Sequence, residues 1–175
     1  MRNIVLIGMS GVGKTTIGKY IAKKLNMTFI DTDDIIITKV GSTIAEIFNN
    51  YGEDYFRELE KQVVDEVSRY DNVVITTGGG VVLNRSNIDN LRNNGVIFLL
   101  QASLNTLYNN LKKDVKDEHR PLLKGLDLRS RLEKLYNERK AFYLSSADFI
   151  IKVDGKSVNE IGDEIIFIFE SLKPL

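Results

Sequence analysis

The chain has 175 residues, of which 43% are hydrophobic and 27% charged, and this composition is that of a globular domain and excludes a disordered protein. Lys and Arg total 24, as do Asp and Glu, so the formal net charge of zero gives no reason to expect a nucleic-acid partner. The absence of cysteine excludes disulfides and thiol catalysis. No apolar run approaches membrane-spanning length, and the N-terminal run is too short for a signal peptide. We therefore expect one domain over residues 1–175, located in the cytoplasm and without a membrane partner.

The first predicted element is an apolar strand at 3–7, which leads into Gly-Met-Ser-Gly-Val-Gly-Lys-Thr at 8–15. The spacing G-x-x-x-x-G-K-T, between a strand and a helix, predicts a loop that binds a nucleotide triphosphate. Its glycines let backbone N–H groups surround a phosphate, and the helix N-terminus adds partial positive charge. Lys14 is expected to reach the β- and γ-phosphates, and the Thr15 hydroxyl to ligate Mg²⁺. The expected nucleotide-binding set here is Gly11, Val12, Gly13, Lys14, Thr15 and Thr16.

Short runs rich in Val and Ile alternate with helical patterns along the rest of the chain. Further strands are predicted at 28–30, 73–76, 96–100 and 148–152. The helical stripes are Ile17, Ile21 and Leu25; Phe56, Leu59, Val63, Val67 and Tyr70; Leu128, Leu132, Leu135 and Phe142; and Val158, Ile161, Ile165, Ile168 and Leu172. Nearly continuous apolar strands that alternate with helices predict a parallel sheet covered on both faces. The expected fold class is therefore α/β, a three-layer α/β/α P-loop fold with a five-stranded parallel sheet.

Three acids gather after the second predicted strand, at Asp31, Asp33 and Asp34. Asp is a favoured helix N-cap, but one acid is enough for a cap, and like charges packed together are costly without a cation. The three acids have two possible interpretations. They cap the following helix, or they bind a metal or a substrate, and we favour the binding role for at least one of them.

A triple glycine, Gly78-Gly79-Gly80, follows the third predicted strand, at the place where an ordinary ATPase carries an acid. The Asp-x-x-Gly and Asn-Lys-x-Asp motifs that are typical of a GTPase are also missing from the sequence. Three glycines form either a tight turn or a bare backbone against which a ligand lies, and we favour the second. Because ligands bind at the carboxyl ends of parallel strands, the phosphate loop, the acids and these glycines are expected to share one crevice.

Arg57, on the long predicted helix, is by its residue type alone more typical of a solvated charge or an intrahelical ion pair.

Taken together, the ordered motifs resemble those of the shikimate kinase family. The matching segments, within about residues 4–145, are the phosphate loop at 8–15, Asp31-Thr32-Asp33, Phe56-Arg57, Gly78-Gly79-Gly80, Arg120-Pro121-Leu122-Leu123, and Glu138-Arg139 followed by Tyr143. The resemblance implies transfer of the γ-phosphoryl group of ATP, with Mg²⁺, to the 3-hydroxyl of shikimate, on the pathway to chorismate and the aromatic amino acids. It is compatible with a monomer.

The resemblance also implies roles for single residues. Asp33 matches the acid that hydrogen-bonds the reacting hydroxyl, and with Lys14 and Arg120 it makes up the expected catalytic set. Arg120 is also expected to bind the nucleotide, as part of a lid over about 109–124. Asp31 is expected to lie near Mg²⁺ together with Thr15. Arg57 and Arg139 are expected to hold the shikimate carboxylate, and Gly79 and Gly80 to contact shikimate through their backbone.

Other functions stay open at this point. A gluconate or nucleoside monophosphate kinase is the alternative within the same class, and a catalytically silent nucleotide-binding protein is the alternative outside it. Asn110 departs from the family pattern, because the family often has an arginine there that stacks on adenine. The adenine-contacting residues are therefore not predicted.

Overall fold

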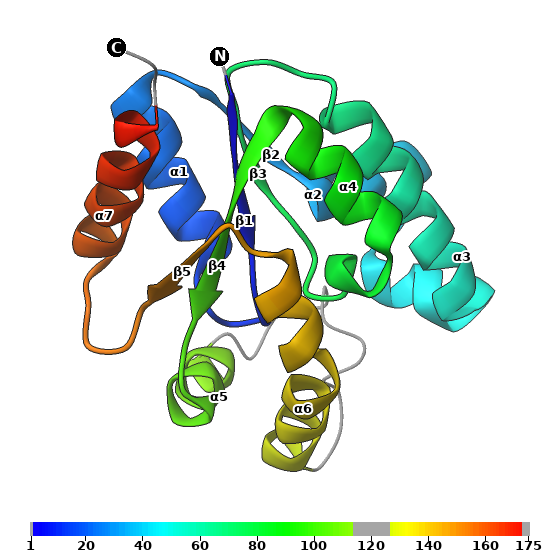
Figure 1. Ribbon diagram of the computed structural model, residues 1–175. Helices are drawn as coiled ribbons and strands as arrows, with labels where there is room; N and C mark the ends of the chain where they lie inside the picture. Colours follow the sequence, from blue (N-terminus) through cyan, green and yellow to red (C-terminus); the bar gives the residue numbers. More distant parts are fainter. Residues whose placement is uncertain (1, 114–126, 173–175) are drawn as a thin grey trace.

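The computed structural model describes residues 2–113 and 127–172, and Figure 1 shows their arrangement. The strands are β1 (Asn3–Ile7), β2 (Thr28–Asp31), β3 (Val73–Thr76), β4 (Gly95–Gln101) and β5 (Phe149–Lys152). The helices are α1 (Lys14–Leu25), α2 (Thr32–Val40), α3 (Ile44–Val67), the 3₁₀ turn η1 (Val81–Leu83), α4 (Arg85–Asn94), α5 (Leu104–Lys113), α6 (Leu128–Ser146) and α7 (Val158–Ser171).

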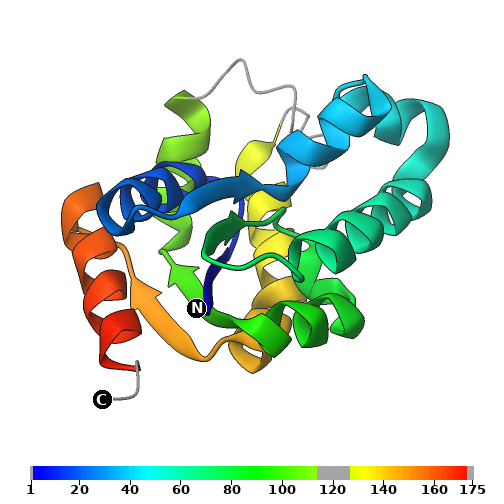
Figure 2. The ribbon, with the colours of Figure 1, turned by 90° about the horizontal axis from the view of Figure 1, so that it is seen from above.

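The five strands form one parallel sheet in the order β2-β3-β1-β4-β5. Helices α1 and α7 pack together on one face, and α3, α4 and α6 lie across the other (Figures 1 and 2). Strand β1 is central and buried along its whole length, and β3 and β4 flank it with nearly continuous Val, Ile and Leu. Such runs are what a strand buried on both faces requires, so the predicted three-layer α/β/α fold is confirmed.

All five sequence-predicted strands are present, with bounds shifted by one residue or less. Three helical stripes differ from the prediction at their ends. Helix α7 ends at Ser171, and Leu172 beyond it is 40% exposed. Helix α3 ends at Val67, and Tyr70 beyond it is 41% exposed. On α6, Phe142 is 46% exposed and the next residue, Tyr143, is buried instead. The buried face of α6 continues through Arg139 to Tyr143, at helical spacing from Leu132, so a count of apolar residues alone selected the wrong aromatic.

Because the sheet is parallel, the carboxyl ends of its strands meet at one edge. The phosphate loop leaves β1 there, the acids leave β2, and the triple glycine leaves β3. Since β2, β3 and β1 are neighbours in the sheet, these three segments lie side by side, as the sequence predicts.

A buried glycine lets α1, the helix that follows the phosphate loop, pack closely against this sheet. Gly18 is buried on α1, and a Cβ atom there would lie 2.7 Å from Thr76 Cγ2 and 2.9 Å from Phe29 Cε2. No real Cβ atom tolerates such approaches, so any side chain at this position must push α1 away from β2 and β3.

We therefore predict that Gly18→Ala lowers the free energy of unfolding by about 1–3 kcal/mol, the usual cost of overpacking. The direction is informative because alanine inside a helix is otherwise favoured over glycine by about 1 kcal/mol. Urea unfolding followed by circular dichroism measures the change, with the exposed Lys23→Ala on the same helix as control. A Gly18→Ala chain as stable as the wild type would contradict the close packing.

Candidate active site

The phosphate loop has the backbone that its sequence predicts. Gly11 and Gly13 have φ values of 84° and 100°, in the left-handed region where only glycine is comfortable, and Gly13 is the N-cap of α1. The Lys14 ammonium group donates to the carbonyl oxygens of Gly8 at 2.7 Å and Met9 at 3.0 Å. The loop therefore folds around its own lysine and holds that charge at the N-terminus of α1, where an anion is favoured.

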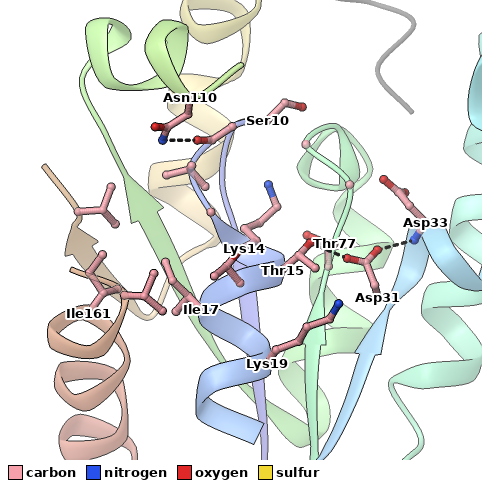
Figure 3. A pocket seen from close by; sticks show the side chains of 18 of the residues that line it. Ser10, Lys14, Thr15, Ile17, Lys19, Asp31, Asp33, Thr77, Asn110 and Ile161 are labelled. Atoms are coloured by element: carbon pink, nitrogen blue, oxygen red, sulfur yellow. Dashed lines mark hydrogen bonds between the residues drawn. The ribbon is translucent and has the colours of Figure 1, made fainter. Parts of the chain in front are cut away.

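A cleft of about 1190 Å³ opens beside this loop (Figure 3). Its walls carry all six predicted nucleotide-binding residues from Gly11 to Thr16, together with Asp31, Asp33, Gly78 and Gly79. At its other end lie residues of α5, of the loop that follows β5 and of α7: Thr106, Asn110, Lys113, Val153, Gly155, Lys156, Val158 and Ile161. The cleft joins the triphosphate end of the site to a mixed polar and apolar end that sequence reasoning did not identify.

Asp31 serves as the N-cap of α2, since its Oδ1 accepts from the backbone N–H of Asp33 at 3.0 Å. Its Oδ2 accepts from the hydroxyls of Thr15 at 3.1 Å and Thr76 at 2.8 Å. The cap interpretation is thus confirmed for Asp31. The same contacts place a hydroxyl and a carboxylate, both hard oxygen donors of the kind that Mg²⁺ prefers, at the mouth of the phosphate loop. No cluster of three or more acidic or histidine side chains suited to a metal occurs among the described residues.

Asp33 and Glu60 approach each other across the backbone of Gly78. A Cβ atom on Gly78 would lie 2.9 Å from Asp33 Oδ1 and 3.1 Å from Glu60 Oε1, so with any other residue at position 78 these carboxylates would have to shift. Each of these two oxygens is buried without a hydrogen-bond partner among the described residues. Burial raises the pKa of Asp33 to about 7, and the charges of Asp31 and Glu60 act in the same direction.

The next two glycines lie against two arginines. A Cβ atom on Gly79 would be 3.3 Å from Arg139 Nη1 and 3.3 Å from Ser10 Oγ of the phosphate loop. A Cβ atom on Gly80 would overlap the guanidinium group of Arg57. The triple glycine therefore lets side chains of the protein itself close onto the backbone, in addition to any ligand. Arg57, Gly80 and Arg139 do not line the large cleft; Arg139 lies against Gly79, which does line it, and Arg57 lies against Gly80.

Arg57 makes the intrahelical pairs that its sequence position favoured. It donates to Glu53 at 3.0 Å and to Glu60 at 2.9 Å. Glu60 is fully buried, and burial raises its pKa, while the charges of Arg57 and Arg139 oppose that change. Sequence reasoning missed Glu60, although an acid on the apolar stripe between Phe56 and Val63 was a readable signal.

Arg139 is only 5% exposed and belongs to the buried face of α6. Beside it, the Tyr143 hydroxyl donates to the carbonyl oxygen of Gly79, and burial raises the Tyr143 pKa to about 12. Tyr143 thus stays protonated as a donor and fixes the glycine loop to α6. Arg120 and most of the predicted lid lie outside the described residues. Residues 109–113, assigned to the same surface segment, form the last turn of α5, with Leu111 buried.

The geometry combines a triphosphate loop, two hard oxygen donors, two arginines, and two buried carboxylate oxygens without hydrogen-bond partners among the described residues, all at a single sheet edge. Such an arrangement suits phosphoryl transfer, which needs positioning and charge neutralisation more than covalent chemistry.

No helix among the described residues is long and apolar enough to span a bilayer.

Comparison with known proteins agrees with this geometry. A family model described as shikimate kinase matches residues 10–169. Shikimate kinase from Caldanaerobacter subterraneus subsp. tengcongensis is 49% identical over 173 residues, which cover 99% of each chain. The structure of shikimate kinase from Acinetobacter baumannii in complex with shikimate has a TM-score of 0.91 and 31% identity, covering 99% of this chain and 96% of that one. A gluconokinase from Sinorhizobium meliloti 1021 has a TM-score of 0.61 and 18% identity, over 98% of this chain and 93% of that one, and shares the fold alone. The chain belongs to the shikimate kinase family.

Proposed function

We propose that the chain transfers the γ-phosphoryl group of ATP to the 3-hydroxyl of shikimate, giving shikimate 3-phosphate and ADP. The observation that carries this proposal is the triple glycine, which brings Asp33, Arg57 and Arg139 to the side of the phosphate loop where an acceptor must lie. Family membership and the shikimate-bound relative from Acinetobacter baumannii support it. Gluconate kinase activity is disfavoured, since that likeness is one of fold only.

The nucleotide is held by the phosphate loop. Backbone N–H groups of the loop and the charge of Lys14 bind the β- and γ-phosphates, and Thr16 supports the loop. The Thr15 hydroxyl and the Asp31 carboxylate would hold Mg²⁺, which fits because both are hard oxygen donors at the loop's mouth. When bound, the ion neutralises charge on the phosphates. Arg120 is proposed to add positive charge there, from outside the described residues.

The acceptor is held on the other side of the same edge. Asp33 Oδ1, for which residues 2–113 and 127–172 provide no hydrogen-bond partner, accepts a hydrogen bond from the reacting hydroxyl and orients it toward the γ-phosphate. The guanidinium groups of Arg57 and Arg139, whose planar forks match a carboxylate, bind the shikimate carboxylate. The backbone of Gly79 and Gly80 contacts the ring between them. The chain is proposed to act as a monomer in the cytoplasm, with residues 1–175 as one domain.

Steady-state kinetics with ATP and a panel of acceptors tests the proposal. Release of ADP is expected with shikimate and not with gluconate or CMP, and it should stop when EDTA removes divalent ions and resume with excess Mg²⁺. Turnover of gluconate or CMP without turnover of shikimate would reject the proposed acceptor. Tight ATP binding without turnover of any acceptor would identify a silent nucleotide-binding protein.

Asp33→Asn is predicted to lower kcat by about 10²-fold or more, the usual scale for loss of a group that handles the proton. The dissociation constant of ADP should change little, because Asp33 follows β2 and the phosphate loop follows β1. Kinetics and calorimetry measure the two quantities. The exposed Asp89→Asn on α4 is the matched control. Unchanged turnover in Asp33→Asn would remove Asp33 from the proposed mechanism.

Arg139→Lys is predicted to raise the shikimate KM by about tenfold, since lysine keeps the charge but lacks the planar fork, and hydrogen bonds to charged groups are worth about 1.5–3 kcal/mol. The ATP KM should change far less. Arg129→Lys, at an exposed position of the same helix, is the control. Equal rises in both KM values would assign Arg139 to the nucleotide instead of the acceptor.

A further inference from the structure

Asn110, which the sequence left without a role, touches the phosphate loop directly. Its amide Nδ2 donates to the carbonyl oxygen of Gly11 at 2.8 Å (Figure 3). The orientation of this amide follows from chemistry, because a carbonyl oxygen can only accept and must face the NH₂ group. Asn110 lies on α5, 99 residues away in sequence, so the contact joins two distant parts of the cleft.

The surrounding packing makes α5 a wall of the phosphate loop. A Cβ atom on Gly11 would lie 2.7 Å from Leu111 Cγ and 3.2 Å from the Leu107 carbonyl oxygen. Leu107 and Leu111 are both buried in the core, so this wall is fixed. The loop therefore has no room to move toward α5, and Asn110 stops it from moving away.

The hydrogen bond fixes one particular peptide plane. The Gly11–Val12 peptide has its carbonyl bound by Asn110, and its N–H donates to the Met9 carbonyl oxygen at 3.3 Å. Since a peptide is planar, partners on both sides determine its orientation. The same Met9 oxygen accepts from Lys14 Nζ at 3.0 Å. One continuous chain of hydrogen bonds thus runs from Asn110 through the loop backbone to Lys14.

We propose that Asn110 is a positioning residue for the phosphate loop, which holds the Gly11–Val12 peptide and, through Met9, the loop conformation that presents Lys14 to the phosphates. Asn110 acts on the triphosphate end of the nucleotide through the protein backbone. Its contribution is therefore independent of which base the nucleotide carries. This inference rests on the proposed function to the extent that the cleft binds ATP.

The test compares a ligand with a base to one without. Dissociation constants of ADP and of inorganic tripolyphosphate are measured by calorimetry for the full chain and for Asn110→Ala. Both are expected to rise by the same factor, about three- to tenfold, the scale of one ordinary hydrogen bond. The ATP KM should rise by a similar factor while the shikimate KM stays unchanged. Asn109→Ala, the exposed neighbour on the same helix, is the matched control and should bind both ligands like the wild type.

A second variant separates the hydrogen bond from packing. Asn110→Leu keeps side-chain volume beside Gly11 but has no donor, so it should lose at least as much affinity as Asn110→Ala. Wild-type affinity in Asn110→Leu would overturn the proposal, because it would indicate a packing role. A rise in the dissociation constant of ADP alone, in either variant, would also overturn it, because it would indicate a contact with the base. If the wild-type chain turns over shikimate and both Asn110 variants bind the two ligands as tightly as the wild type, this inference alone is refuted. A wild-type chain that binds neither ligand would refute the proposed function as well.

Discussion

The site depends on the close approach of charged side chains to a backbone without side chains of its own. Asp33 and Glu60 lie against Gly78, Arg139 against Gly79, and Arg57 against Gly80. None of these three glycines has a positive φ value, so conformational freedom is not what the positions demand. What they demand is space, because a methyl group at any of them would meet a carboxylate or guanidinium atom at van der Waals contact or closer. The approach is closest at Gly80, where a methyl group would overlap the guanidinium group of Arg57 and displace it.

Packing four charged groups around three residues is tolerable only if the charges compensate. Glu60 is fully buried and would be costly alone, but Arg57 binds it directly and Arg139 lowers its pKa from nearby. Asp33 has no such partner for Oδ1, and its pKa is raised to about 7. The contrast separates the two acids by task. Glu60 binds Arg57 through Oε2, while Asp33 makes no ion pair among the described residues; each acid keeps one buried oxygen without a hydrogen-bond partner among them.

Much of this arrangement was readable from the sequence, because it rests on local patterns. The five strands were predicted from apolar runs, and the crevice from the rule that parallel strands end at one edge. Two errors arise where burial and polarity conflict. The predicted stripe of α6 includes Phe142, yet the face of α6 that is buried is the one that carries Arg139 and the Tyr143 hydroxyl. Glu60 was overlooked because buried acids are rare, and its partner Arg57 was recognised only through family resemblance.

The contact between Asn110 and Gly11 lies beyond any local pattern, because 99 residues separate the two partners and neither belongs to a motif of the other. The two halves of the site are carried by different helices. Gly18 of α1 against β3 and Asn110 of α5 against Gly11 hold the phosphate loop, while α2, α3 and α6 carry the charged groups that lie against the triple glycine. Three loop residues nevertheless reach the other half: Ser10 lies beside Gly79, Met9 accepts from the Tyr143 hydroxyl, and Thr15 donates to Asp31. Because the two halves are anchored on different helices, a change on one side can alter affinity for one substrate while leaving the other nearly unaffected.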